Sequence, residues 1–262
     1  MNKDYINSLS EKGLRIDGRK LDEYRKISIE TGVSKNAEGS SRVKIGDTEV
    51  ICGVKLDLGK PYPDSPDEGS IMVTAELSPL ASPRFESGPP SAESIELARV
   101  VDRGIRESKS IDLKKLCLKK GESIWTVFID IYPQNDSGNL LDASALAAAV
   151  ALKAAKFPKI VKDQVQYGEF TTKSLPVKDI PIACTFGKIN GKIILDMNNQ
   201  EESSFDARLT VTTFNGNIHA MQKGGAKGFT IEEINSMVET AIKNEKEIRK
   251  LLWTSQSMKK QE

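Results

Sequence analysis

The stretch DASALAAAVALKAAKF, from Asp142 to Phe157, decides the fold. Alanine has the highest helix propensity, so the stretch is predicted to form a helix that stops at Pro158. Its many small side chains allow close packing on a sheet. Directly upstream, ESIWTVFIDIYP (Glu122 to Pro133) is a run of aromatic and β-branched residues that is typical of a buried strand.

Hairpins are predicted on both sides of this core. Tight turns are expected at three dipeptides: Gly46-Asp47, Asn190-Gly191 and Asn215-Gly216. A last helix is predicted from Thr230, because Thr230 and Glu233 stand at capping-box spacing. Strands mixed with a few helices, with hairpins throughout, indicate an α+β fold rather than a doubly wound one.

The composition describes an ordinary globular protein. Its 262 residues include 38 Lys and Arg against 37 acids, a net charge of +1, so diffuse positive charge does not mark it as a nucleic-acid protein. The three cysteines form no CxxC pair and His219 is the only histidine, which argues against a zinc site. With no apolar run of about 18 to 20 residues and no apolar signal core in MNKDYINSLSEK, we expect a cytoplasmic protein.

A second informative stretch is ELSPLASPRFESGPPSAESIELARVVDRGIRES, from Glu76 to Ser108. It leads through a proline-rich segment into a predicted helix. At about 100° per residue, three arginines fall within roughly 80° of one another: Arg99, Arg103 and Arg106. Three apolar residues gather on the opposite side: Leu97, Val101 and Ile105.

Two interpretations of the arginine face are open. An arginine stripe suits a run of phosphates, because each guanidinium stays charged and can bridge two oxygens. However, Glu96 precedes Arg99 by three residues and Asp102 precedes Arg106 by four, which are the spacings of ordinary helix ion pairs. On spacing alone, the solvated face is the favoured interpretation.

Several further segments of the chain, taken together, resemble those of a known protein family. From about Gly13 to Trp253 the chain resembles the RNase PH-like subunits of the archaeal RNA-degrading exosome, specifically the ring subunit that is not the catalytic one. The segments that carry the resemblance, besides the arginine stretch, are RIDGR (Arg15 to Arg19), IETGV (Ile29 to Val33), EGSSRV (Glu38 to Val43), GDTEVICGVK (Gly46 to Lys55), NDSGNLLDAS (Asn135 to Ser144), DARLTV (Asp206 to Val211) and QKGG (Gln222 to Gly225).

The resemblance implies a fold and partners. The expected fold is RNase PH-like, related to domain 2 of ribosomal protein S5, with mixed sheets backed by helices in two joined α/β halves. We expect residues 1–30 to be an N-terminal extension, 31–160 the first half, and 161–262 the second half with the C-terminal helix. The expected assembly is a six-membered ring, a trimer of heterodimers with a catalytic RNase PH-like subunit. S1- and KH-domain cap proteins and single-stranded RNA are the other expected partners, and no membrane is expected.

The resemblance also reverses the interpretation of the arginine face. In this family the matching helix faces the RNA path, so Arg99 and Arg103 are the first candidates for contacts to RNA phosphates, followed by Arg106. Arg84, in the loop before the helix, is a weaker candidate.

The residues needed for phosphorolysis are missing at two positions. The reaction requires cationic and N–H donors around phosphate and a carboxylate near the leaving oxygen. Active members of the family carry an Asp-Gly-Gly-Thr/Ser-Arg turn, and here Leu140 stands where the arginine belongs. They also carry a Glu-Ala-Asp-Met/Leu-Pro pattern, and here Arg208 stands at the aspartate. We therefore expect an inactive subunit with no catalytic residue.

Two neighbouring features have simpler interpretations. Four acids could suggest a magnesium cluster, but a solvated acidic hairpin turn is the favoured interpretation: Asp196, Glu201, Glu202 and Asp206. Gly224 and Gly225 are predicted to form a flexible turn, because no GK[ST] follows them. Neither a metal nor a cofactor is expected.

The sequence leaves three candidate functions to be tested. The first is a non-catalytic ring subunit that structures the catalytic partner's active site and helps bind RNA for 3′-to-5′ phosphorolytic degradation. The alternative is that the chain is itself an active phosphate-dependent 3′-to-5′ exoribonuclease. A free-standing RNA-binding module is the third, and the near-neutral charge and absence of an aromatic stacking motif disfavour it.

Overall fold

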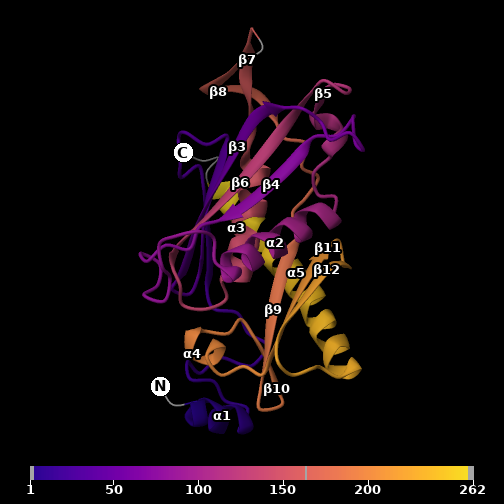
Figure 1. The fold of residues 1–262 in the computed structure, drawn as a ribbon. Coiled ribbons are helices and arrows are strands. Elements are labelled where there is room, and N and C mark those ends of the chain that lie inside the picture. The colour runs from indigo at the N-terminus through magenta and orange to yellow at the C-terminus, as the bar shows by residue number, and fades with distance from the viewer. Residues whose placement is uncertain (1–2, 163, 259–262) are drawn as a thin grey trace.

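The computed structural model describes residues 3–162 and 164–258 of the chain. Their strands form two main sheets, and helix α3 (Leu140–Ala154) contacts strands of both (Figure 1). Twelve of the 15 residues of α3 are buried, as expected for a helix with no solvated side. This confirms the predicted α+β class and the predicted close packing of the alanine-rich helix.

The first sheet has the strand order β1-β2-β3-β6-β4, with β5 paired to β6. Its neighbours are antiparallel except β4 and β6, which are parallel. Helix α2 (Ala92–Glu107) lies on the connection between those two strands. The strands of this sheet are β1 (Ile27–Thr31), β2 (Gly39–Ile45), β3 (Thr48–Gly59), β4 (Ser70–Ala75), β5 (Cys117–Lys119, after the 3₁₀ turn Leu113–Leu116) and β6 (Ser123–Asn135).

The second sheet has the antiparallel order β10-β9-β11-β12, and helix α5 (Ile231–Met258) packs on β9 and β11. The predicted capping box of α5 is confirmed, because the Thr230 N–H donates to Glu233 Oε2 at 2.8 Å and the Glu233 N–H donates to Thr230 Oγ1 at 3.2 Å. The strands of this sheet are β9 (Ile182–Ile189), β10 (Lys192–Leu195), β11 (Ala207–Phe214) and β12 (Asn217–Gly225).

Smaller elements complete the described part of the chain. A separate hairpin, β7 (Lys156–Val161) with β8 (Gln164–Ser174), extends from one end of the first sheet (Figure 1). Helix α1 (Lys3–Glu11) lies beside the β9–β10 turn, and α4 (Asn199–Glu202) is a single turn before β11. None of the helices in the described ranges is long and apolar enough to cross a bilayer.

The three predicted hairpin turns are confirmed. Asn190 and Gly191 have φ values of 47° and 77°, and Asn215 and Gly216 have φ values of 52° and 76°. Two successive positive φ angles match the twist of antiparallel strands, and asparagine and glycine tolerate them best. Gly46, at the third turn, has φ 59°.

Two local predictions are wrong. The helix predicted to run to Phe157 ends at Ala154, and Phe157 and Pro158 lie in β7 instead. Phe157 packs against Trp125 with ring centroids 5.6 Å apart, so a core contact replaces the last helical turn. Gly224 and Gly225 belong to β12 rather than to a flexible turn, and Gly224 stands opposite Arg208 of β11.

A buried carboxylate, Asp196, joins the two halves of the fold to the amino-terminal segment. It accepts hydrogen bonds from Arg25 Nη2 at 2.7 Å, Arg19 Nη1 at 2.9 Å and Asn139 Nδ2 at 2.8 Å. Its side chain is completely buried. Burial by itself raises the pKa of Asp196, but the hydrogen bonds and the charge of Arg25 outweigh burial and hold the pKa below its ordinary value.

A second buried ion pair lies beside it. Arg15 donates from Nε and Nη2 to both carboxylate oxygens of Glu201, at 2.9 and 2.6 Å, and from Nη1 to the Leu195 carbonyl. Both side chains are almost fully buried. The amino-terminal segment is therefore held to the second sheet by bidentate, charge-assisted bonds.

We predict that Asp196→Asn destabilises the fold by about 3–5 kcal/mol, because it leaves the buried guanidinium of Arg25 without its counter-charge. Urea unfolding monitored by circular dichroism measures the effect. Asp17→Asn is the matched control: it removes the partly exposed partner of Arg19 and is expected to cost less than ~1 kcal/mol. Equal costs for the two variants would show that Asp196 is not a structural hub.

Candidate functional site

Helix α2 presents its predicted arginine face to solvent. Ser91 caps the helix by accepting from the Ser94 N–H, and Gly104 lies against Thr212 of β11, where a Cβ would stand 3.3 Å from the threonine methyl. The predicted apolar side is buried: Leu97, Val101 and Ile105. The three arginines are exposed: Arg99, Arg103 and Arg106.

The three arginines differ in their partners. Arg106 donates from Nη2 to Asp102 Oδ1 at 2.7 Å, so the ordinary helix ion pair forms at this position. Arg103 Nη1 reaches Gln222 Oε1 only at 3.4 Å. Arg99 has no hydrogen-bond or ion-pair partner in residues 3–162 and 164–258, because Glu96 pairs with Arg208 Nη2 at 2.6 Å instead.

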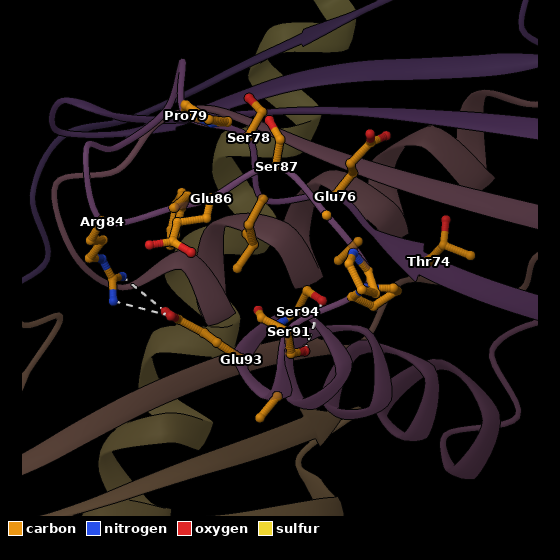
Figure 2. A pocket seen from close by; sticks show the side chains of 17 residues that line it. Thr74, Glu76, Ser78, Pro79, Arg84, Glu86, Ser87, Ser91, Glu93 and Ser94 are labelled. Atoms are coloured by element: carbon orange, nitrogen blue, oxygen red, sulfur yellow. Dashed lines mark hydrogen bonds and ion pairs between the residues drawn. The ribbon is translucent and has the colours of Figure 1, made fainter.

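Arg84 is committed to neighbouring acids. Its Nη2 lies 2.8 Å from Asp136 Oδ2 and 2.9 Å from Glu93 Oε1. Figure 2 shows Arg84 pointing toward Glu93 across the mouth of a pocket of about 740 Å³, which lies between the end of β4, the proline-rich loop and the start of α2. The Arg84 guanidinium is therefore paired with two carboxylates.

A second pocket, of about 520 Å³, brings together the two positions that depart from the active pattern. Leu140 at the start of α3 and Arg208 on β11 both line it, although 68 positions separate them in sequence. Glu96 of α2 and Glu202 of α4 line the same pocket. The fold therefore brings two departures from the active pattern, which look independent in the sequence, into one cavity.

A carboxylate occupies the start of α3. Asn139 has φ 59°, a left-handed conformation, and its backbone N–H donates to Glu202 Oε1 at 2.7 Å. An N–H at a helix amino terminus is a natural anion site, and here the anion is a side chain of the same protein. Burial raises the pKa of Glu202 to about 7, and the nearby charge of Asp136 acts in the same direction. The hydrogen bond from the Asn139 N–H and the charges of Arg84 and Arg208 lower this pKa, but they do not outweigh burial.

The pocket contains few uncommitted cations. Arg84 and Arg208 each contact a glutamate of α2, Glu93 and Glu96 respectively. Leu140 is buried and supplies no donor. An incoming phosphate would therefore meet more negative than positive charge, with the helix N–H already engaged.

The prediction of a solvated acidic turn is wrong for three of its four residues. Asp196 and Glu201 are buried and ion-paired to arginines of the amino-terminal segment, and Glu202 is half-buried over α3. Asp206 pairs with Lys227 at 3.2 Å. In the described ranges, no group of three or more histidine, cysteine or acidic side chains could hold a metal ion.

Asp142 is a further buried acid that the sequence analysis did not single out. It accepts from Tyr24 Oη at 2.6 Å, Thr185 Oγ1 at 2.6 Å and Asn139 Nδ2 at 2.8 Å. Burial raises its pKa to about 6, although these donors act in the opposite direction. No local pattern signals the whole site, because two of these three donors come from segments 118 and 43 residues away.

Comparison with known proteins places these observations in a family. Residues 23–158 match domain 1 of the 3′ exoribonuclease family, RNase PH, and residues 179–244 match domain 2. The exosome complex component Rrp42 of Methanocella arvoryzae is 49% identical over 251 residues, which cover 95% of each chain.

Solved structures place the chain in the same family. A chain of the Archaeoglobus fulgidus exosome with RNA bound to the active site is 46% identical, with a TM-score of 0.86 and coverage of 95% of this chain and 96% of that one. A chain of an archaeal exosome core is 43% identical, with a TM-score of 0.84 and 94% coverage of both. The chain therefore belongs to the 3′ exoribonuclease family of RNase PH, and its predicted resemblance to exosome ring subunits is confirmed.

Proposed function

We propose that this chain is a non-catalytic ring subunit of an archaeal exosome. It binds passing single-stranded RNA and completes the active site of a catalytic RNase PH-like neighbour, which degrades the RNA from its 3′ end with phosphate. Relatives that are nearly half identical to this chain are named as exosome components, and a solved exosome that contains a similar chain holds RNA in its active site. Docking of S1- and KH-domain caps on this ring belongs to the same proposal.

One observation carries the non-catalytic assignment. One pocket is lined by both Leu140 and an ion-paired Arg208, the two positions at which the resemblance leads us to expect a phosphate-binding arginine and a carboxylate in active members. A hydrocarbon side chain replaces a charge-assisted donor, which costs about 1.5–3 kcal/mol of phosphate binding. An arginine replaces an acid, so neither proton transfer nor metal binding is available at that position.

The Glu202 carboxylate adds a third obstacle. It accepts the Asn139 N–H at the position where phosphate would use the amino terminus of α3. It also lies near Arg84 and Arg208, whose charges act against burial and lower its pKa. These contacts support an inactive pocket whose polar groups are bonded to the chain's own side chains.

The RNA contact is proposed for the exposed face of α2. Arg99 and Arg103 carry charge that no carboxylate of the described residues neutralises, and both are exposed. Arg106 belongs to the same stripe, but its pair with Asp102 makes it the weakest of the three. Arginine suits this role because its charge is permanent and its donors match phosphate oxygens.

We also propose the division of the chain stated above, with an extension at residues 1–30 and halves at 31–160 and 161–262. Its support is that the two main sheets do not interleave along the chain: the strands up to β6 build the first, and β9 to β12 build the second.

The isolated chain is expected to release no nucleoside diphosphates from single-stranded RNA and phosphate, whereas a ring reconstituted with the catalytic subunit releases them. Chromatography of the products measures this. Leu140→Arg alone is expected to remain inactive, because Arg208 still opposes the carboxylate requirement and Glu202 would pair with the new arginine. Nucleoside diphosphates from the pure wild-type chain would overturn the proposal and favour the alternative of an active enzyme.

Replacing Glu202 with glutamine should change the pH dependence of stability. The folded chain keeps the Glu202 proton up to about pH 7, whereas the unfolded chain releases it near 4.5. That proton stabilises the fold below pH 4.5, and the stabilisation is lost as the pH rises to about 7. The free energy of unfolding of E202Q relative to wild type should therefore rise across this window, by at most about 1.4 kcal/mol per pH unit.

Urea unfolding at several pH values measures this difference. Glu247→Gln is the control, because Lys250 lowers the pKa of Glu247, so the folded state is ionised across the window and the unfolded state over all but its most acidic part. A flat difference for E202Q would mean that the Glu202 carboxylate is not held in a buried site.

In the reconstituted ring, Arg99→Glu with Arg103→Glu should weaken RNA binding and processive degradation, because the stripe would then repel phosphates. Each lost phosphate contact should reduce the salt dependence of binding to single strands by about 0.7 in slope. Arg106→Gln is the matched control, with a smaller expected effect because Asp102 already neutralises Arg106. If the double variant kept an unchanged salt slope, the arginine face would be an ordinary solvated surface.

A further inference from the structure

We propose that Arg208 is a positioning residue for RNA binding: it holds the Glu96 carboxylate and thereby leaves the Arg99 guanidinium available to a phosphate of single-stranded RNA. The inference rests on the proposed function, since it assigns a partner to the arginine face of α2. It gives a role to the arginine that stands where active members of the family carry an aspartate.

The contact itself is close and specific. Arg208 Nη2 lies 2.6 Å from Glu96 Oε1, and the Arg208 side chain is 18% exposed while that of Glu96 is 37% exposed. Arg208 Nε is buried and has no hydrogen-bond partner in the described ranges. Within those ranges, the Arg208 side chain makes a single hydrogen bond, the one to Glu96. A hydrogen bond between two charged groups in a partly buried place is of the stronger kind.

The neighbouring strand leaves room for this arrangement. In the β11–β12 register, Arg208 stands opposite Gly224. A Cβ at Gly224 would lie 3.0 Å from Arg208 Nη2, so a larger residue would displace the guanidinium. Glycine at this strand position therefore preserves the path by which Arg208 reaches α2.

Helix α2 contains a second acid–arginine pair with which Glu96 and Arg99 can be compared. Glu96 precedes Arg99 by three residues, a spacing at which helix ion pairs form. About two turns later, Asp102 and Arg106 stand at a four-residue spacing, no cation from outside α2 holds Asp102 in the described ranges, and the pair forms at 2.7 Å. Glu96, by contrast, pairs with Arg208 of β11 and not with Arg99 of its own helix.

The other charged groups near this pair have partners of their own. Glu202 accepts the Asn139 N–H, and Arg84 contacts Asp136 and Glu93. Without Arg208, the Glu96 carboxylate would remain on α2 with Arg99 as the nearest partner on the helix. It would neutralise Arg99 and add a negative charge beside the proposed RNA path.

The test uses the ring assembled with the catalytic subunit, which carries an inactivating substitution so that RNA is bound but not degraded. A fluorescently labelled oligoadenylate is titrated at several salt concentrations. Arg208→Gln is expected to weaken binding about fivefold, the effect of one charge near the surface, and to lower the salt slope by about 0.7, as Arg99→Gln does. Thermal unfolding of each variant confirms that it folds.

The deciding measurement is rescue. Adding Glu96→Gln to Arg208→Gln should restore the affinity, because no carboxylate then neutralises Arg99. The matched control adds Glu169→Gln instead, which removes an exposed glutamate paired with Lys159 on the β7–β8 hairpin, and it should restore nothing. In the Arg208→Gln background, Arg99→Gln should have little further effect, since coupled residues are not additive.

The outcomes separate the two proposals. Normal binding by Arg99→Gln would contradict the proposed RNA contact itself. If Arg99→Gln weakens binding and Arg208→Gln does not, only the positioning role of Arg208 is wrong. Weak binding by Arg208→Gln that Glu96→Gln fails to restore would also overturn the positioning role, because Arg208 would then act by its own contact.

Discussion

The arrangement of the pocket depends on one buried carboxylate. Asp196 accepts from Arg19 and Arg25 of the amino-terminal segment and from the Asn139 side chain at the start of α3. Arg25 in turn donates to the carbonyls of Ser137 and Gly138, which form the turn before the helix. A buried charge is tolerated only when it is paired, so these segments must come together for the fold to form. The conformation of the turn follows from that requirement.

Once the turn is fixed, its polar groups serve the fold rather than a ligand. Its carbonyls face Arg25, and the Asn139 N–H faces Glu202. Gly138 lies so close to α4 that a Cβ would stand 2.6 Å from the Asn199 nitrogen. A phosphate site requires such donors to be open, whereas here the Asn139 N–H is bonded to a side chain of the same protein.

Local features of the sequence were predictable, and long-range pairs were not. The Asn-Gly turns, the capping box at Thr230 and the two faces of α2 depend on near neighbours, and the structure confirms them. The acids after β10 were assigned wrongly, because Arg15 lies 186 residues from Glu201 and no local pattern announces the pair. The losses at Leu140 and Arg208 were readable one by one, but their meeting in one cavity required the fold. The RNA contacts of the arginine face and the domain boundaries stay predictions.

In a chain with a net charge of +1, the number of arginines says little about nucleic-acid binding. What matters is which guanidinium groups lack a carboxylate. Arg84 and Arg106 are exposed in part but paired, whereas Arg99 is exposed and without a partner in the described ranges. The difference originates in the second sheet, where Arg208 binds the acid that Arg99 would otherwise meet. Because a surface ion pair is weak, a competing cation is enough to redirect one glutamate. One arginine of β11 therefore affects how much unpaired positive charge α2 exposes.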